Sequence, residues 1–304
     1  GSPPGNLFVS GPGAATVGGV ADRTGVDFVA APAAAPQNSY EIRKPRIAMY
    51  QRYGGGNMDE GWTRLMFEQF DLPFTSIKDA EIKAGNLEAK YDVVVLPADS
   101  MGAMTGERSP EGRAEGPGQG GRGGGGRGGG PDNTPPEYRS GFGAEGVQAL
   151  DAFVQKGGTL LTFAQSGDLP IQRFGLPVRN IVAGLSSTEF WSPGSTLRVR
   201  FDNDHPIAYG MPAEGLPLFL AGGQFYEVTS TERSQVVAIV WTFVDRDILQ
   251  SGWLLGEQVI AKKAAAVVVQ HGDGRVVLIG FRPQHRDQTH GTFKLVFNTL
   301  LGAP

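Results

Sequence analysis

One hydroxyl and two imidazoles are the groups in this chain that could support hydrolysis. Ser166 lies in the run Ala-Gln-Ser-Gly-Asp that directly follows the apolar segment Thr159–Phe163. A serine on a strand-to-helix turn becomes a nucleophile when a nearby base takes its proton, and His285 or His290 could be that base. The alternative, which the sequence favours, is that the Ser166 hydroxyl caps the next helix.

The same two histidines are candidate metal ligands, with Asp287 as the one carboxylate close to them in sequence. His285 and His290 are five residues apart, and that spacing does not stack two imidazoles on one helix face as i, i+4 does. The sequence therefore favours a hydrogen-bonded loop over a metal site, and no cofactor is expected. The chain has no cysteine, which excludes thiol catalysis, disulfides and thiolate ligands.

Tryptophan, acids and amides indicate a third kind of site, a surface for a peptide or a sugar. Part of it falls at the start of the helix expected within Asn57–Arg64, where the alternative is ordinary capping by Asn57 or Asp59 with acids favoured by the helix dipole. The candidate lining residues are Asp59, Glu60, Trp62, Asp99, Glu189, Trp191, Gln284 and His285.

The composition restricts the class of protein. The 304 residues, 40% hydrophobic and 19% charged, can bury a substantial core. The net charge of −4 gives no basic field for nucleic acid. No apolar run approaches the ~18 residues that a membrane span needs. The first residues, Gly1-Ser2-Pro3-Pro4, contain no signal peptide and are interpreted as the start of an excised fragment.

Alternating strands and helices predict a doubly wound α/β sheet. The helix expected over Met58–Phe70 places Trp62, Leu65, Met66 and Phe70 at helical spacing. Tyr91–Pro97 is a continuous apolar run, as in a central parallel strand covered on both faces. The other elements expected in this part are strands at Arg46–Tyr50, Phe74–Ile77 and Thr159–Phe163 and a helix at Ala144–Lys156.

The later part predicts an antiparallel extension of the sheet. Asp273-Gly274 is a strong hairpin signal between two apolar runs. Trp241 and Trp253 lie in apolar surroundings and are expected in the core. The strands expected here are Leu197–Phe201, Leu218–Ala221, Val236–Phe243, Ala265–Gln270 and Arg275–Phe281, and Thr292–Leu301 is a closing helix.

Two regions are predicted. Residues 1–40 are a partial β-α-β segment, with strands at Leu7–Ser10 and Val26–Ala31 around a helix at Ala14–Thr24, and a linker. Residues 41–304 are the main domain, with a disordered glycine-rich insertion at about 104–136. Eleven of the fifteen residues 116–130 are glycine. An arginine-glycine arm for RNA is the alternative to a tolerated surface insertion, but nearby glutamates offset its three arginines, so nucleic-acid binding is not expected.

Five motifs lie along most of 45–301. They are Asn-Met-Asp-Glu-Gly-Trp-Thr-Arg from Asn57, Phe-Gly-Leu-Pro-Val-Arg-Asn from Phe174, His-Pro-Ile-Ala-Tyr-Gly-Met-Pro from His205, Ser-Gly-Trp-Leu-Leu-Gly from Ser251 and the run Gly280–Phe293. In these motifs the chain resembles the class I glutamine amidotransferase-like domain that follows the peptidase domain in large bacterial M14-type zinc carboxypeptidase-like proteins. That resemblance implies a flavodoxin-like fold.

The resemblance also implies where a catalytic site would be. In class I amidotransferases the loop after the last buried strand carries His-Pro-Glu, and here it reads Arg282-Pro283-Gln284. By the same resemblance the nucleophile position falls on Gln165. A carboxamide is not a nucleophile and a guanidinium stays protonated, so the site is expected to be degenerate. None of the four histidines begins the His-x-x-Glu of an M14 zinc site.

The sequence thus predicts a non-catalytic amidotransferase-like accessory domain of an M14 zinc carboxypeptidase-like protein. Its expected roles are domain packing or peptide or glycan binding, and its expected partner is the peptidase domain of the parent chain. By resemblance the parent is periplasmic or secreted. The alternative is a hydrolase that uses Ser166 or a metal site at His285 and His290.

Overall fold

The computed structural model describes residues 8–9, 11, 13–30, 42–54, 57–107, 135, 141–230, 235–242 and 247–302. Most of the glycine-rich insertion predicted at about 104–136 lies outside these residues. Helix α4 (Met101–Thr105) ends close to the predicted start of this insertion, with Met104 and Thr105 buried.

A five-stranded parallel sheet forms the centre of the main domain. Its strands are β1 (Ile47–Tyr50), β2 (Phe74–Ile77), β3 (Val93–Leu96), β4 (Thr159–Phe163) and β14 (Gly274–Ile279). They lie in the order β2-β1-β3-β4-β14, and all four neighbouring pairs are parallel. This is the flavodoxin-like order 2-1-3-4-5, so the predicted fold class is confirmed.

An antiparallel extension continues the sheet beyond β14, as predicted. Strand β13 pairs with β14 through a hairpin whose turn contains Gly272 in the left-handed region (φ +63°). This part of the sheet comprises β13 (Ala264–His271), β11 (Val236–Thr242), β7 (Val199–Phe201), β8 (Glu214–Gly215), β10 (Tyr226–Val228) and β5 (Val178–Asn180).

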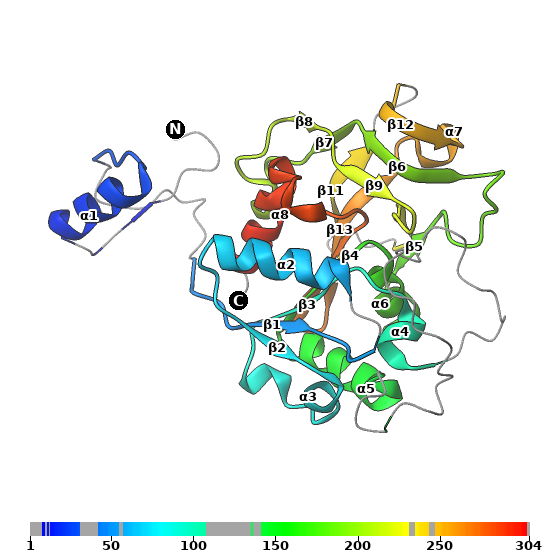
Figure 1. Cartoon of the computed structure of the whole chain (residues 1–304), viewed down its shortest axis with the longest axis horizontal. Coiled ribbons are helices and arrows are strands. Elements are labelled where there is room, and N and C mark those ends of the chain that lie inside the picture. Colours follow the sequence, from blue (N-terminus) through cyan, green and yellow to red (C-terminus); the bar gives the residue numbers. More distant parts are fainter. Residues whose placement is uncertain are drawn as a thin grey trace.

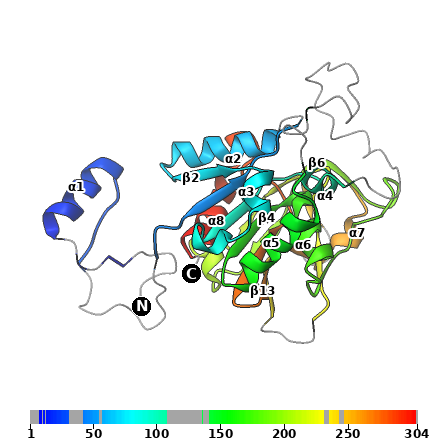
Figure 2. The same ribbon diagram turned by 90° about the horizontal axis from the view of Figure 1, so that it is seen from below.

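Helices cover both faces of the parallel sheet, so its strands are apolar on both sides. In β1, Ile47 and Met49 belong to one core and Ala48 and Tyr50 to the other. Figures 1 and 2 show the two helical layers. The first core packs against α2 (Met58–Gln69) and α8 (His290–Leu301), and the second against α3 (Asp79–Lys83), α4, α5 (Gly143–Gln155) and α6 (Asp168–Arg173).

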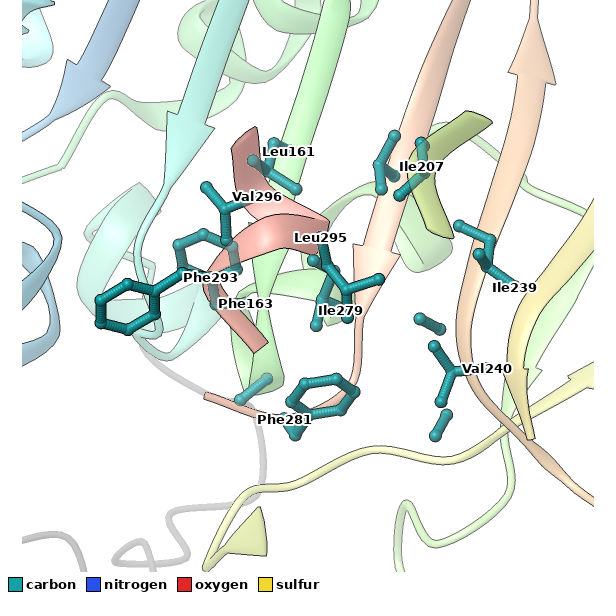
Figure 3. Packing of buried hydrophobic residues seen from close by; sticks show 14 of the residues in the cluster. Leu161, Phe163, Ile207, Ile239, Val240, Ile279, Phe281, Phe293, Leu295 and Val296 are labelled. Atoms are coloured by element: carbon teal, nitrogen blue, oxygen red, sulfur yellow. The ribbon is translucent and has the colours of Figure 1, made fainter. Parts of the chain in front are cut away.

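Helix α8 closes the first core. Figure 3 shows Phe293, Leu295 and Val296 of α8 directed toward the strands, near Phe163 and Ile279. All five side chains are at most 3% exposed. The predicted closing helix and its apolar face are therefore confirmed.

A separate three-stranded antiparallel sheet lies at one end of the domain, next to α7 (Glu257–Ile260) (Figure 1). Its strand order is β12 (Leu249–Leu255), β6 (Trp191–Leu197), β9 (Leu218–Leu220). Short 3-10 helices complete the domain: η1 (Leu87–Ala89), η4 (Ala164–Gly167), η5 (Pro206–Ala208) and η6 (His285–Asp287).

The N-terminal helix is as predicted, but the strands expected beside it are not seen. Helix α1 spans Ala14–Thr24 and ends at Gly25 in the left-handed conformation. Residues 26–30 and Phe8 and Val9 form no strand. A strand needs a neighbour to satisfy its backbone hydrogen bonds, and these short apolar runs have none among the described residues.

One predicted core assignment was wrong: Trp253 is 65% exposed on the edge strand β12. Trp241 is partly buried and packs against the second core. On α2, Met66 is buried as predicted, but Leu65 and Phe70 are 42% and 53% exposed. The side chains that α2 buries include acidic and hydroxyl groups. These groups contact the site described in the next subsection.

Candidate functional site

Four loops meet at the carboxyl edge of the parallel sheet. They follow β1, β3, β4 and β14 and carry Arg52, Asp99, Gln165 and Arg282. Ligands of α/β proteins bind at this edge. The degenerate catalytic positions were predicted here, and the structure brings two of them into contact.

Arg282 holds this edge together. Its Nε atom donates to both carboxylate oxygens of Asp59, at 2.9 and 3.0 Å, and its Nη2 atom donates to Oε1 of Gln165 at 3.2 Å. Nη1 donates to the carbonyl oxygen of Ala221 at 3.2 Å. Arg282 and Asp59 are each 7% exposed. We call this set of Asp59, Gln165, Ala221 and Arg282 the arginine lock.

Asp59 reaches the lock from the first turn of α2. Asn57 caps this helix, because its Oδ1 atom accepts from the backbone N–H groups of Asp59 (2.9 Å) and Glu60 (3.4 Å). Burial raises the pKa of the Asp59 carboxyl above its ordinary value, and the Arg282 guanidinium opposes that shift. A charge inside a protein requires such a partner.

The turn after β4 is strained, as a nucleophile elbow would be, but one residue earlier than the resemblance implied. Ala164 adopts a φ of +45°, a region that residues other than glycine rarely occupy. The elbow residue is thus Ala164, and Gln165 follows it. The Ala164 methyl group has no nucleophilic atom and is fully buried.

Ser166 points into the protein. Its Oγ atom accepts from the backbone N–H of Phe163 at 3.0 Å and lies within hydrogen-bonding distance of the carbonyl oxygens of Phe163 (2.8 Å) and Leu96 (2.9 Å). The residue is 0% exposed. Its hydroxyl therefore joins the end of β4 to the end of β3, a structural position that does not suit a nucleophile.

The two imidazoles make their contacts with groups other than the Ser166 hydroxyl. The His285 ring packs edge-on against Trp62 with centroids 4.7 Å apart. Burial, helped by the charges of Arg282 and Arg286, lowers the pKa of His285 to about 4. The Nε2 atom of His290 is 2.9 Å from the carbonyl oxygen of Asp287.

No cluster of three or more His, Cys, Asp or Glu side chains suited to a metal ion is found in the described part of the chain. His285 Nδ1 and Asp287 Oδ1 are buried and make no hydrogen bond to the residues described. Among the described residues, no third protein ligand of the kind that an open catalytic zinc site needs accompanies His285 and Asp287.

Asp99 forms a second polar group beside the lock. Arg52 Nε donates to its Oδ2 atom at 2.6 Å, and Asn57 Nδ2 donates to the same atom at 3.3 Å. The backbone N–H of Ser100 donates to Oδ1 at 2.9 Å. The Asp99 charge also contributes to the raised pKa of Asp59.

Four of the predicted binding residues cannot contact a ligand at this edge of the sheet. Gln284 is fully buried, and its Nε2 atom donates to the Thr63 hydroxyl at 3.1 Å. Glu60 is buried and pairs with Arg64, one turn along α2. The other two belong elsewhere: Trp191 begins β6 of the separate sheet, and Glu189 is an exposed turn residue whose carboxylate accepts from the Ser186 N–H.

A polar cluster next to the elbow, with Gln224 and Tyr226 buried and Asp168 and Asn180 half-buried, was not predicted from the sequence. Asp168 accepts from Asn180 Nδ2 at 3.4 Å, and the Tyr226 hydroxyl donates to Oε1 of Gln224 at 2.9 Å. Burial raises the pKa of Asp168, while Asn180 and the Gln224 amide oppose the shift. The groups that oppose this shift are amides, and no cation is among them. The sequence does not reveal this cluster, because Gln224 and Tyr226 are distant from Asp168 along the chain.

Two hollows lie away from this edge, at the amino ends of β1 and β2. One has a volume of about 320 Å³ and is lined in part by Ile42, Ile47, Leu72 and Leu301. The other, of about 420 Å³, shares Leu72 with it. Side chains of the arginine lock occupy the position at the carboxyl edge where a ligand pocket would be expected.

Comparisons with known proteins were made for sequence and for fold. No protein-family model matches the chain, and no curated protein does. It is similar to solved structures of a ThuA-like protein from Bacteroides uniformis (10% identity, TM-score 0.45, 89% of this chain and 95% of that one) and of PurLQS from Thermotoga maritima (13%, 0.47, 85% and 98%). A third is a GMP synthase-type protein from Thermoplasma acidophilum (11%, 0.47, 85% and 94%).

The similarity to these three solved structures is a similarity of fold. The fold class stands on the strand order β2-β1-β3-β4-β14 and on the helices that cover both faces of that sheet. In the part of the chain described, no helix has both the length and the apolar character needed to cross a membrane.

Proposed function

We propose that this chain is a non-catalytic, amidotransferase-like accessory domain. The arginine lock is the observation that carries the proposal. At the edge where an amidotransferase holds a thiolate and an imidazole, this chain has a methyl group at the elbow and a buried guanidinium paired with Asp59. A permanently protonated guanidinium can neither take nor give a proton.

The hydrolase alternative lacks its geometry. A nucleophilic serine requires a base within hydrogen-bond reach, directly or through one water. The Ser166 hydroxyl contacts backbone groups of Phe163 and Leu96, and the His285 ring packs against Trp62. The combination of Ser166 with an imidazole therefore receives no support from these contacts.

The accessory role is proposed to be domain packing or the binding of a peptide or glycan. Trp62, His285 and Asp99 are the predicted binding residues that are partly exposed near the arginine lock. An indole with an imidazole edge-on and a carboxylate nearby offers an apolar face and polar groups together. By the sequence motifs, the partner would be the peptidase domain of an exported M14-type parent protein.

Two measurements test the proposal. Glutamine and ester hydrolysis should stay at the level of buffer, and zinc titrated by calorimetry should release no heat of stoichiometric binding. Turnover that disappears in Ser166→Ala would overturn the proposal. So would tight zinc binding that disappears in His285→Ala. Gln288→Ala, an exposed change in the same loop, is the matched control.

A further inference from the structure

The loop between β7 and β8, residues 202–213, contacts α8 through the short helix η5. We call it the η5 loop. Its side chains Ile207 and Met211 are 2% and 5% exposed and belong to the first core, and Figure 3 shows Ile207 there. Asn298 of α8 donates through Nδ2 to the carbonyl oxygens of Ile207 and Tyr209, both at 2.9 Å. The η5 loop therefore covers part of the first core.

An imidazole caps the first turn of η5. His205 precedes this helix, and its Nδ1 atom accepts a hydrogen bond from the backbone N–H of Ile207 at 3.2 Å. Because a backbone N–H can only donate, Nδ1 carries no proton, and the proton of the neutral ring is on Nε2. Pro206 lies between the two and has no N–H to satisfy. The imidazole thus has the role that an asparagine or serine side chain has at other helix starts.

Protonation of the His205 ring removes this cap. An imidazolium carries a proton on each nitrogen and accepts no hydrogen bond, so the Ile207 N–H loses its acceptor. Burial lowers the pKa of His205, the Asp202 charge opposes this shift, and the Arg275 charge adds to it. The neutral ring that caps η5 is therefore the form present at neutral pH.

The charged groups around the ring come from three elements. Asp202, on the same loop, is a carboxylate whose Oδ1 atom also accepts from the Asp204 N–H at 3.3 Å, and Asp204 itself is exposed. Arg275, on β14, is a cation whose charge acts on the ring. Lys294, on α8, is a second cation at this loop, because its Nζ atom donates to the Gly210 carbonyl at 3.0 Å. Two of the three elements thus oppose a positive charge here.

We propose that His205 is a pH-sensitive switch that releases the η5 loop from α8 in acid. While the ring is neutral, it caps η5 and the loop covers the core. Once the ring is an imidazolium, the first turn of η5 has lost its cap, and the loop opens more often. An opened loop exposes the apolar side chains of Ile207 and Met211.

The direction of the pH dependence follows from the environment of the ring. The folded pKa of His205 lies below the ordinary 6.5, so the stability that the cap contributes is fully present above pH 6.5. It is lost as the pH falls through the folded pKa. Loss of a helix cap should increase the opening of the loop by about three- to thirtyfold.

Hydrogen exchange of the full chain, followed by NMR, tests the proposal. The amides of Ala208, Tyr209 and Met211 donate hydrogen bonds within the η5 loop and report its opening. The ring protons of His205 report its titration. Exchange is measured at pH 8 and at one pH unit below the measured pKa of the ring, and each rate is corrected for the intrinsic pH dependence of exchange. Opening should increase by about three- to thirtyfold in acid.

Two variants distinguish the cap from a general effect of acid. His205→Asn supplies an acceptor that does not titrate, so the loop amides should be equally protected at both pH values. His205→Ala has no cap, and the same amides should open about three- to thirtyfold more often than in the wild type already at pH 8. His290→Asn, on α8, is the matched control and should keep the wild-type response.

Four results would overturn the proposal. The first is a loop whose opening does not change while the His205 ring titrates. The second is a ring that stays neutral until the whole domain unfolds. The third is a pH response that persists in His205→Asn, which would assign it to another group. The fourth is a His205→Ala variant that is as protected at pH 8 as the wild type, which would show that the cap does not hold the loop.

Discussion

Arg282 Nε donates to both carboxylate oxygens of Asp59, at 2.9 and 3.0 Å, inside a domain where both side chains are 7% exposed. The two residues are 223 positions apart. Their contact links the loop after the last parallel strand to the first turn of α2. The pair lies at the carboxyl edge of the sheet, where an amidotransferase-type fold would have its catalytic residues.

Removing one member of this pair should be costly. Arg282→Met leaves the Asp59 carboxylate buried without its partner, and the free energy of unfolding should fall by about 3–5 kcal/mol. Urea unfolding followed by circular dichroism measures it. The double variant Asp59→Asn with Arg282→Met should recover much of the loss. The control is Arg173→Met, which removes a surface pair with Glu107 and should cost about 1 kcal/mol or less.

A substitution at Ser166 tests whether its hydroxyl is structural or nucleophilic. Ser166→Ala removes the acceptor of the Phe163 N–H and the donor to the Leu96 carbonyl, and should destabilise the domain by about 1–3 kcal/mol. Thermal unfolding measures this. Ser251→Ala, on an exposed strand position, should change stability by less than about 0.5 kcal/mol. Equal effects in the two variants would contradict the structural role.

Asp168 should make stability depend on pH. Burial raises its pKa in the folded state, so its favourable contribution is present in acid below the ordinary value of 3.8 and is lost as the pH rises through the folded pKa. Asn180, Gln224 and Tyr226 face it without supplying a cation. Asp168→Asn should therefore be more stable than the wild type at pH 7, and the difference should shrink toward pH 3. A difference that does not vary with pH would refute this assignment.

The His285 imidazole should stay neutral at pH values well below its ordinary pKa. Its folded pKa of about 4 lies under the ordinary 6.5, so the stability that its neutral form contributes is present above pH 6.5 and is lost as the pH falls toward 4. NMR titration of the ring protons measures the pKa. Trp62→Ala opens the ring to water and should raise it toward 6.5. Leu65→Ala, on the same helix, should leave it near 4.

Two glycines should respond in opposite directions to alanine. Gly61 lies exposed within α2 with no atom within 4 Å of an added Cβ, so Gly61→Ala should stabilise the domain by about 0.5–1 kcal/mol. At Gly280 an added Cβ would lie 2.1 Å from the Gln224 carbonyl oxygen. Gly280→Ala should cost about 1–3 kcal/mol or more. Differential scanning calorimetry compares the two; a tolerated Gly280→Ala would contradict the close approach of these segments.

Local sequence patterns predicted the parallel strands well, because each is a short apolar run bounded by turns and buried on both faces. The closing helix was evident from helical spacing, and the hairpin from turn chemistry, although its turn residues Gly272 and Asp273 lie one position before the predicted pair. Strands β7, β9, β11 and β13 were found with boundaries shifted by a few residues, whereas β5, β6, β8, β10 and β12 were not predicted. Such patterns depend on contacts that neighbouring residues make along the chain.

The site was predictable only in part. The facing of Gln165 and Arg282 followed from the family resemblance, and their hydrogen bond confirms that the two side chains meet. The partner Asp59 was assigned to a binding surface, because no local signal tells a carboxylate that caps or binds from one that pairs 223 residues away. The exposure of Trp253 was missed for the related reason that an apolar run does not reveal which of its faces is covered.

A reactive atom at the elbow after β4 would distinguish a catalytic domain from one that has lost its catalytic residues. The test is intact-protein mass spectrometry after prolonged exposure to a serine-reactive fluorophosphonate and to an electrophilic glutamine analogue. With the methyl of Ala164 at the turn and the Ser166 hydroxyl bonded to backbone groups, the mass should stay unchanged in the folded protein. A stoichiometric adduct on Ser166, lost in Ser166→Ala, would contradict the central claim.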